Sequence, residues 1–183
     1  MANKTTTVIA EAISRVLGPP VWISLAGFAL WQHYSLDLVS LVIVSLPVVV
    51  PVGLYILLYV FVWRKIDYEF TNVKTRRPIL LIAMLGLSIS ILLSINTLPV
   101  ITPILIRLLI VLVVTTAITF YWKISFHTTF YTISVLLISS MIGTAFLAFL
   151  VLLPPLFWSR IYLKKHEFAQ LVLGSIVSLL VII

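Results

Sequence analysis

The fold class is decided by residues 79–122, which read ILLIAMLGLSISILLSINTLPVITPILIRLLIVLVVTTAITFYW. Two apolar runs, residues 79–95 and 101–122, are separated by a short segment that contains Asn96 and Pro99. Each run is long enough to cross about 30 Å of hydrocarbon as an α-helix, at ~1.5 Å per residue. Asparagine and proline between such runs favour a tight turn. The stretch therefore predicts a helical hairpin that spans a membrane twice.

The rest of the chain has the same apolar character. Of its 183 residues, 62% are hydrophobic and only 9% are charged, which excludes a water-soluble domain of ordinary surface. Further helices are predicted from the other apolar runs, which are residues 21–34, 38–63, 127–138, 145–158 and 171–183. A bend at Gly143 is expected between the runs 127–138 and 145–158. The predicted fold is an all-α, polytopic transmembrane bundle of about six to seven helices, forming a single membrane domain over residues 1–183.

Two segments lie outside these runs. Residues 1–18 are expected at the membrane interface, with 9–17 as a short amphipathic helix. Residues 64–78 form the main polar loop, with five basic and two acidic side chains. The net charge of +7 favours anionic partners over a buried proton or cation relay. The absence of cysteine excludes thiolate chemistry and Cys-ligated metals, and no cofactor is expected.

Three clusters of polar residues stand out, at 74–78, 123–127 and 159–170. Two predicted spans separate the first cluster from the second, and two shorter helices separate the second from the third. An even number of crossings returns the chain to the same membrane face. We therefore expect all three clusters to meet there in one site.

The side chains in these clusters are suited to phosphate. Arg77 and Arg160 carry planar guanidinium groups that bind phosphate oxygens in pairs, and Lys74 adds positive charge. Ser125 can donate a hydroxyl hydrogen bond to an oxyanion.

His127 and His166 are two of only three histidines in the chain. One imidazole that attacks phosphorus and another that protonates the leaving oxygen suffice for phosphoryl transfer without a metal. The third, His33, lies among aromatic residues that are typical of the headgroup boundary, and we interpret it as structural.

The spacing of these residues resembles a known family. Ser159-Arg160, five residues and then His166 are similar to the third signature of the type 2 phosphatidic acid phosphatase superfamily, which includes vanadium haloperoxidases. Ser125-Phe126-His127 resembles the second signature, and Arg77-Pro78 resembles the end of the first. The resemblance covers residues 65–174, in the order of the family, and is closest to a small prokaryotic membrane branch.

The resemblance implies a function and roles for these residues. His166 would be the nucleophile that forms a phosphohistidine, and His127 the acid that protonates the leaving group. Arg77, Ser125 and Arg160 would hold the phosphoryl oxygens. The protein would be a metal-independent, membrane-embedded lipid phosphatase acting on a polyprenyl diphosphate, phosphatidate or phosphatidylglycerophosphate.

The chain departs from the family pattern at three places. Position 70, where the family has lysine, is Phe70, so Lys74 or Lys65 would supply the charge. The usual proline and glycine of the second signature are Ile124 and Phe126, which puts a bulky ring beside the phosphate.

The third departure is Gln170, which stands where the family has an orienting aspartate. On a helix, Gln170 can still accept the Nδ1 proton of His166, but it brings no negative charge. An alternative function is therefore a catalytically weak or inactive lipid-phosphate binding or scaffold protein. A transporter or channel is disfavoured, because the charges gather at one surface instead of threading the spans.

The predicted location is a prokaryotic cell membrane, as a multi-pass integral protein. Eleven of the 12 Lys and Arg residues fall on the face with the motifs or in its flanks, and Arg107 lies nearer the other. The positive-inside rule therefore predicts a cytoplasmic active face. The expected partners are the lipid phosphate and the bilayer but no nucleic acid, and the sequence leaves open a homo-oligomer.

Overall fold

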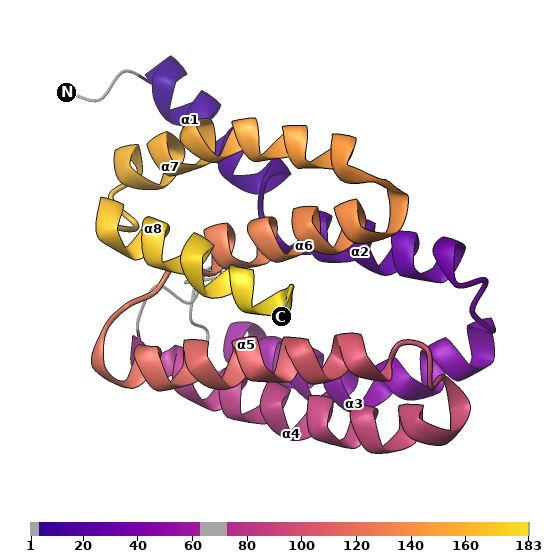
Figure 1. Cartoon of the computed structure of the whole chain (residues 1–183). Coiled ribbons are helices and arrows are strands. Elements are labelled where there is room, and N and C mark those ends of the chain that lie inside the picture. The colour runs from indigo at the N-terminus through magenta and orange to yellow at the C-terminus, as the bar shows by residue number, and fades with distance from the viewer. Residues whose placement is uncertain (1–3, 63–72, 183) are drawn as a thin grey trace. The chain divides into compact units, whose positions relative to one another are not determined.

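The computed structural model describes residues 4–62 and 73–182. All regular secondary structure in these residues is helical, which confirms the predicted all-α class (Figure 1). Within the single membrane domain that the sequence predicts, the chain forms two compact units. The first unit comprises Met1–Ser35 and Lys123–Ile183, and the second unit comprises Leu36–Trp122.

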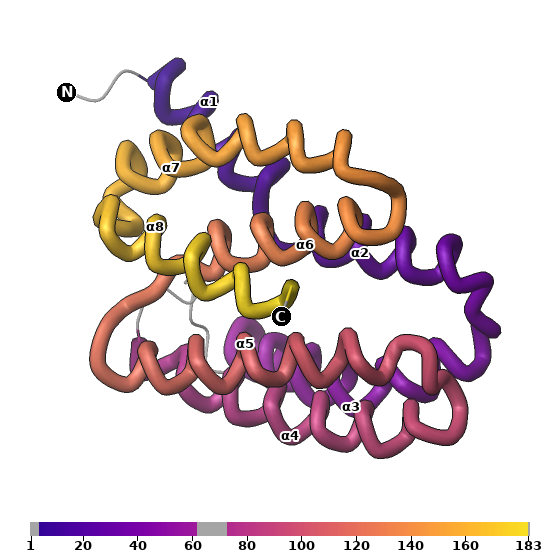
Figure 2. The backbone as a smooth tube through the Cα atoms, viewed as in Figure 1, coloured from indigo at the N-terminus to yellow at the C-terminus, as the bar shows by residue number. Residues whose placement is uncertain are grey.

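The second unit consists of three long helices, which are α3 (Leu38–Leu57), α4 (Val73–Thr97) and α5 (Thr102–Tyr121). A π-helical turn, Leu58–Val62, follows α3. Helix α4 packs against both neighbours (Figure 2). The predicted hairpin over residues 79–122 is confirmed, and the hydroxyl groups of Ser94 and Thr102 lie 2.9 Å apart across its turn.

Helix α3 begins after Asp37, whose carboxylate accepts a hydrogen bond of 2.8 Å from the Ser40 N–H. This bond lowers the pKa of Asp37. The helix continues through Pro47 and Pro51. Gly86 of α4 lies against the backbone at the first proline, where a Cβ atom at position 86 would come 2.8 Å from the Pro47 carbonyl carbon. Glycine therefore permits the close approach of α3 and α4.

The boundary of the predicted polar loop needs a correction. Helix α4 begins at Val73, so residues 73–78 are helical and only residues 64–72, which lie outside the described residues, remain of the predicted loop. Lysine and arginine are good helix formers, and Pro78 removes only one hydrogen bond near the helix start. The Tyr55 hydroxyl donates to the Thr75 carbonyl at 3.3 Å and satisfies a neighbouring backbone group.

The first unit is built around one central helix. Its elements are α1 (Lys4–Val16), α2 (Pro19–His33), α6 (Phe126–Ile142), the 3-10 helix η2 (Thr144–Leu152), α7 (Leu153–Tyr162), α8 (Phe168–Val177) and the 3-10 helix η3 (Ser178–Val181). Helix α6 contacts α2, η2, α7, α8 and η3 (Figure 1). Every residue from 131 to 139 is buried. Helix α1 packs on α7.

The chain reverses after α6 at the predicted bend. Gly143 has a φ of +135°, a conformation that residues with a side chain rarely adopt. The segment η2–α7 then returns along α6, and the Tyr131 hydroxyl donates to the Phe149 carbonyl at 2.6 Å. Trp22 of α2 stacks edge-on against Tyr131, with ring centroids 4.5 Å apart. Trp22 also contacts Phe149, with ring centroids 6.0 Å apart, so α2 and η2 meet around Tyr131 of α6.

Five helical segments in the described residues are long and apolar enough to cross a membrane, namely Lys4–His33, Leu38–Phe61, Val73–Thr97, Thr102–Tyr121 and Thr144–Tyr162. The apolar helices Phe126–Ile142 and Phe168–Val181 are shorter. The protein is therefore a multi-pass membrane protein by the length and composition of its helices.

Candidate functional site

The end of α7 forms a tight turn that carries the third cluster. Lys164 adopts a left-handed conformation with φ +53°. Its N–H donates to the Ile161 carbonyl at 2.9 Å, and the Lys165 N–H donates to the Arg160 carbonyl at 3.0 Å. This pattern is the Schellman motif that ends many helices. The turn brings His166 back beside the last turn of α7, where its N–H also reaches the Arg160 carbonyl at 3.4 Å.

The second cluster lies against this turn. Lys123 Nζ donates to the Lys165 carbonyl at 2.7 Å. The Ser125 N–H donates to the Gln170 carbonyl at 3.3 Å. Residues 123–127 and 159–170 therefore meet at one end of the first unit, as the sequence predicts for these two clusters.

Arg160 is buried at this end, with 1% of its surface exposed. Its Nη1 donates to Ser14 Oγ of α1 at 2.7 Å and lies 3.5 Å from Nε2 of His127. Because a guanidinium group only donates, the His127 Nε2 that faces it is the acceptor. Arg160 and His127, predicted as phosphate ligand and acid, thus lie together.

His166 is buried, and its Nδ1 lies 3.0 Å from Oε1 of Gln170. The same oxygen accepts the Glu167 N–H at 3.3 Å. A backbone N–H can only donate, so the Gln170 atom between these groups must be its oxygen. Nδ1 of His166 then carries the proton, and the lone pair of neutral His166 is on Nε2. The amide therefore selects the tautomer that a nucleophilic Nε2 requires.

Ser125 is fully buried and caps the start of α6, where its Oγ lies 3.5 Å from the Thr128 N–H. Helix α8 approaches this cap closely at Gly174. A Cβ atom at position 174 would lie 2.8 Å from the Ser125 carbonyl oxygen and 2.9 Å from Oγ1 of Thr129. The glycine thus holds α8, with Gln170, against the start of α6. The ring of Phe126 packs edge-on against Phe130, with centroids 6.1 Å apart.

Three helices begin around this group of residues, which are α2, α6 and α8. At the start of α2, a Cβ atom on Gly18 would lie 3.5 Å from Nε2 of His127. The starts of α6 and α8 meet through the bond between Ser125 and Gln170. The N-terminus of a helix carries a partial positive charge. This end of the first unit is consequently suited to an anion.

Arg77 and Lys74 belong to the second unit. Nη2 of Arg77 donates to the Phe120 carbonyl at 2.9 Å, and its guanidinium carbon lies 4.9 Å from the centre of the Phe120 ring. Lys74 is exposed in the first turn of α4. Phe70 and Lys65, on which the prediction for the first signature depends, lie outside the described residues.

Ser14 is the residue that the sequence analysis missed. It is 2% exposed and bonded to Arg160. Its signal in the sequence is a serine at position 14 between Ala10 and Leu17, in the stripe that α1 buries. That spacing marks one helix face, but a serine on it does not reveal a partner 146 positions away.

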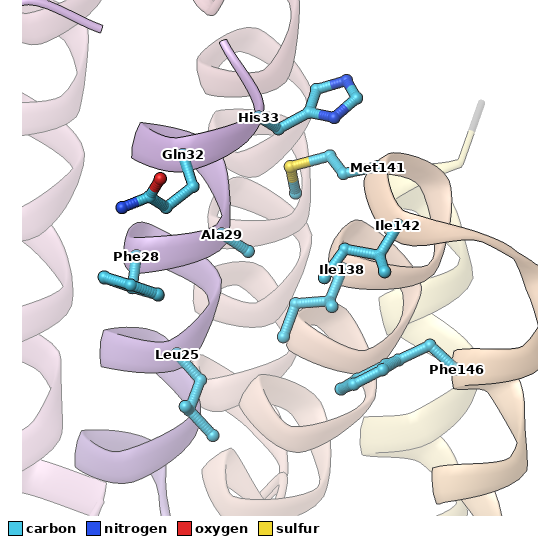
Figure 3. A pocket seen from close by; sticks show the side chains of 9 residues that line it. All are labelled: Leu25, Phe28, Ala29, Gln32, His33, Ile138, Met141, Ile142 and Phe146. Atoms are coloured by element: carbon cyan, nitrogen blue, oxygen red, sulfur yellow. The ribbon is translucent and has the colours of Figure 1, made fainter. Parts of the chain in front are cut away.

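Two apolar cavities lie in the first unit. One, of about 430 Å³, lies between α2 and the far end of α6, where His33, Met141 and Ile138 line it (Figure 3). His33 therefore lies at the opposite end of α6 from His127. The other, of about 700 Å³, lies between α6, η2, α7, α8 and η3, and Ile161 and Phe168 are among its lining residues.

In residues 4–62 and 73–182, no three His, Asp or Glu side chains gather as a metal site would require. Comparisons with protein-family models, with curated proteins and with solved structures gave no match to this chain.

Proposed function

We propose that this protein is a membrane-embedded phosphatase that hydrolyses a phosphomonoester or diphosphate of a lipid through a phosphohistidine. The observation that carries the proposal is the grouping of Arg160, His127 and the hydrogen-bonded pair His166 and Gln170 at one end of the first unit. These groups supply a nucleophile, an acid and a phosphate ligand, which is what phosphoryl transfer requires.

The reaction follows from the protonation of the two histidines. Nε2 of His166 attacks phosphorus, and the bond from phosphorus to the lipid oxygen breaks as His127 gives that oxygen a proton. Water then attacks the phosphohistidine while His127 takes a proton from it. Inorganic phosphate leaves and His166 is restored. Two moderate displacements replace one difficult displacement.

The acid role of His127 depends on a bound phosphoryl group. Nε2 of His127 lies 3.5 Å from the Arg160 guanidinium, so a phosphoryl group that binds Arg160 would lie beside this nitrogen. In the acid role, Nε2 would carry the proton that passes to the leaving oxygen. Ser125 would add a hydrogen bond to the phosphoryl oxygens. Arg77 and Lys74, which the sequence predicts as further phosphate ligands, belong to the second unit.

A lipid fits this chain better than a soluble phosphate ester. The apolar cavity of about 700 Å³ is lined by Ile161 and Phe168, which neighbour the phosphate residues in sequence. The rings of Trp158 and Tyr162 stack on α7 with centroids 5.5 Å apart. Tryptophan and tyrosine favour the headgroup level of a membrane. They would place the end of α7 that carries Arg160 at this level, and the lipid chain would occupy the cavity.

Gln170 supports a second candidate, a lipid-phosphate binding protein with weak or no turnover. The amide fixes the His166 tautomer through its 3.0 Å contact with Nδ1 but does not stabilise an imidazolium by charge. Binding by Arg160 needs no such charge.

The experiment that separates these functions measures two quantities on the same purified protein in detergent. Release of inorganic phosphate is measured from dioctanoyl phosphatidate, a phosphatidylglycerophosphate and a polyprenyl diphosphate, and binding of each lipid is measured in parallel. Phosphate release supports the phosphatase. Binding without release from any of them favours the binding protein, and absence of both would contradict both.

A further inference from the structure

We propose that Ser14, on the N-terminal helix α1, is a positioning residue for Arg160 and makes α1 part of the phosphate site. The inference rests on the proposed function and deepens it, because it adds a segment outside the three polar clusters to the site. Arg160 Nη1 donates to Ser14 Oγ at 2.7 Å, the shorter of its two contacts described above.

The burial of Ser14 distinguishes this contact from an incidental one on the surface. Helix α1 buries Ala10 and Ser14, and Leu17, which directly follows the helix, is buried as well. Ser14 is the polar member of this stripe. Its other side carries the exposed pair Glu11 and Arg15, with an N–O distance of 3.5 Å. A buried hydroxyl without a hydrogen bond costs free energy. The bond from Arg160 removes that cost and fixes the guanidinium at the same time.

The position of Nη1 matters because it also faces His127. One guanidinium nitrogen lies 2.7 Å from Ser14 Oγ and 3.5 Å from Nε2 of His127. A guanidinium group on a long side chain has several rotamers, and a fixed acceptor selects one of them. Ser14 thus holds the Arg160 fork in the orientation in which a phosphoryl group would meet both Arg160 and His127.

The turn after α1, at Gly18, also lies close to the site. A Cβ atom on Gly18 would lie 2.8 Å from the Ser14 carbonyl oxygen and 3.5 Å from Nε2 of His127. The absence of a side chain at Gly18 lets the end of α1 come close to His127. Trp22 Nε1 donates to the Val16 carbonyl at 3.2 Å and ties α2 to this end of α1. Helix α1 is therefore held on the site by the chain on both sides of the turn.

The test compares Ser14→Ala with wild type for binding of dioctanoyl phosphatidate and for kcat/KM of phosphate release. A hydrogen bond to a charged group is lost, so we expect both to fall about 10- to 100-fold. Ser14→Thr, which keeps a hydroxyl, should restore most of the loss. The matched control is Ser139→Ala, which removes another buried serine hydroxyl, bonded at 3.4 Å to the Gly143 carbonyl at the far end of α6, and should leave both unchanged.

A double-mutant cycle separates positioning from a general effect on folding. If Ser14 acts through Arg160, Ser14→Ala in an Arg160→Lys background should cause less than about a threefold further loss. Equal losses in both backgrounds, or unchanged binding in folded Ser14→Ala, would overturn this inference and leave the proposed function intact. If the wild-type protein neither binds these lipids nor releases phosphate from them, the proposed function is overturned, and this inference with it.

Discussion

The two units arrange their apolar helices in different ways. The second unit has three helices of 20, 25 and 20 residues. In the most apolar stretch of the α3 segment, only 6% of the residues are buried. The first unit has shorter and interrupted helices around α6, and it buries Arg160, His166, Gln170 and Ser125. Long exposed helices are suited to the bilayer, whereas the short helices bring their ends together around polar groups.

The difference shows where a membrane protein can bury charged and polar groups. A buried charge requires hydrogen-bond partners that are held in place. In the first unit these partners come from α1, from the start of α6 and from the turn after α7, so no single helix could provide them. The second unit also buries an arginine, Arg76 of α4, which is 1% exposed. Its half-buried neighbour Arg77 finds its partners, the Phe120 carbonyl and ring, on the adjacent helix α5.

Among variants that should keep some activity, the largest effect is expected at His127, the histidine beside Arg160. His127→Ala should lower phosphate release from a lipid by about 10²- to 10⁴-fold, because it removes the acid for a poor leaving group. Release from p-nitrophenyl phosphate, whose leaving group needs no proton, should fall less than about tenfold. Equal losses on the two substrates would argue against the acid role. The control is His33→Ala at the other end of α6, which should leave both rates unchanged.

Substitution of one glycine in each unit tests the comparison directly. Gly174→Ala and Gly86→Ala each place a Cβ atom 2.8 Å from a backbone atom of the neighbouring helix, Ser125 O and Pro47 C respectively. Each should lower the free energy of unfolding by about 1–3 kcal/mol, measured by denaturant titration in detergent.

Only Gly174→Ala should also change the activity of the folded protein. It displaces α8 and with it Gln170, and a shift of about 1 Å at a reacting group can cost roughly 100-fold in rate. Equal losses of specific activity in Gly174→Ala and Gly86→Ala would remove the distinction between the units.

A smaller effect is expected at the orienting amide. Gln170→Asp should raise turnover by up to about tenfold, because a carboxylate would stabilise by charge the imidazolium that the amide cannot. Gln170→Glu keeps the side-chain length and the bond to the Glu167 N–H, and separates the effect of charge from that of reach. Lower turnover in both variants at unchanged expression would show that the site is built around the amide.

Single cysteines test the membrane orientation of both units. The chain has no native cysteine, so Lys164→Cys and Ser35→Cys report on the two ends of the first unit, and Lys74→Cys and Thr97→Cys on the second. With a membrane-impermeant thiol reagent in intact cells, we expect labelling at positions 35 and 97 only, because basic residues favour the cytoplasm. Labelling at 164 and 74 instead would place the site outside. Different results at 164 and 74 would exclude Lys74 from the site.

Much of the helical arrangement could be predicted from the sequence. Apolar runs of membrane length predicted the hairpin of α4 and α5, and Gly143 predicted the reversal after α6. The predicted start of α4 at residue 79 was wrong, because hydropathy marks where a helix enters the hydrocarbon and not where it begins, which is Val73. The division into two units was not predicted, because hydropathy shows that the spans of the second unit are the more hydrophobic but not which helices pack together.

The site was predicted in part. Two relations could be predicted because they are local in the sequence, namely the spacing of Arg160 and His166 and the i, i+4 spacing of His166 and Gln170. In the structure, the His166 N–H contacts the Arg160 carbonyl, and Nδ1 of His166 contacts Oε1 of Gln170. The contact of Ser14 with Arg160 depends on how α1 folds back on α7, which spacing along the chain does not encode. Nor could the sequence reveal that the Glu167 N–H fixes the Gln170 amide.

The central claim is that His166 is the nucleophile of a lipid phosphatase. Its most direct test is phosphate release by His166→Ala, measured beside wild type on the lipid that wild type cleaves best. The variant removes the attacking nitrogen but no spanning helix, so it should insert and elute as a folded protein while releasing no phosphate above background. Retained release by folded His166→Ala would contradict the account.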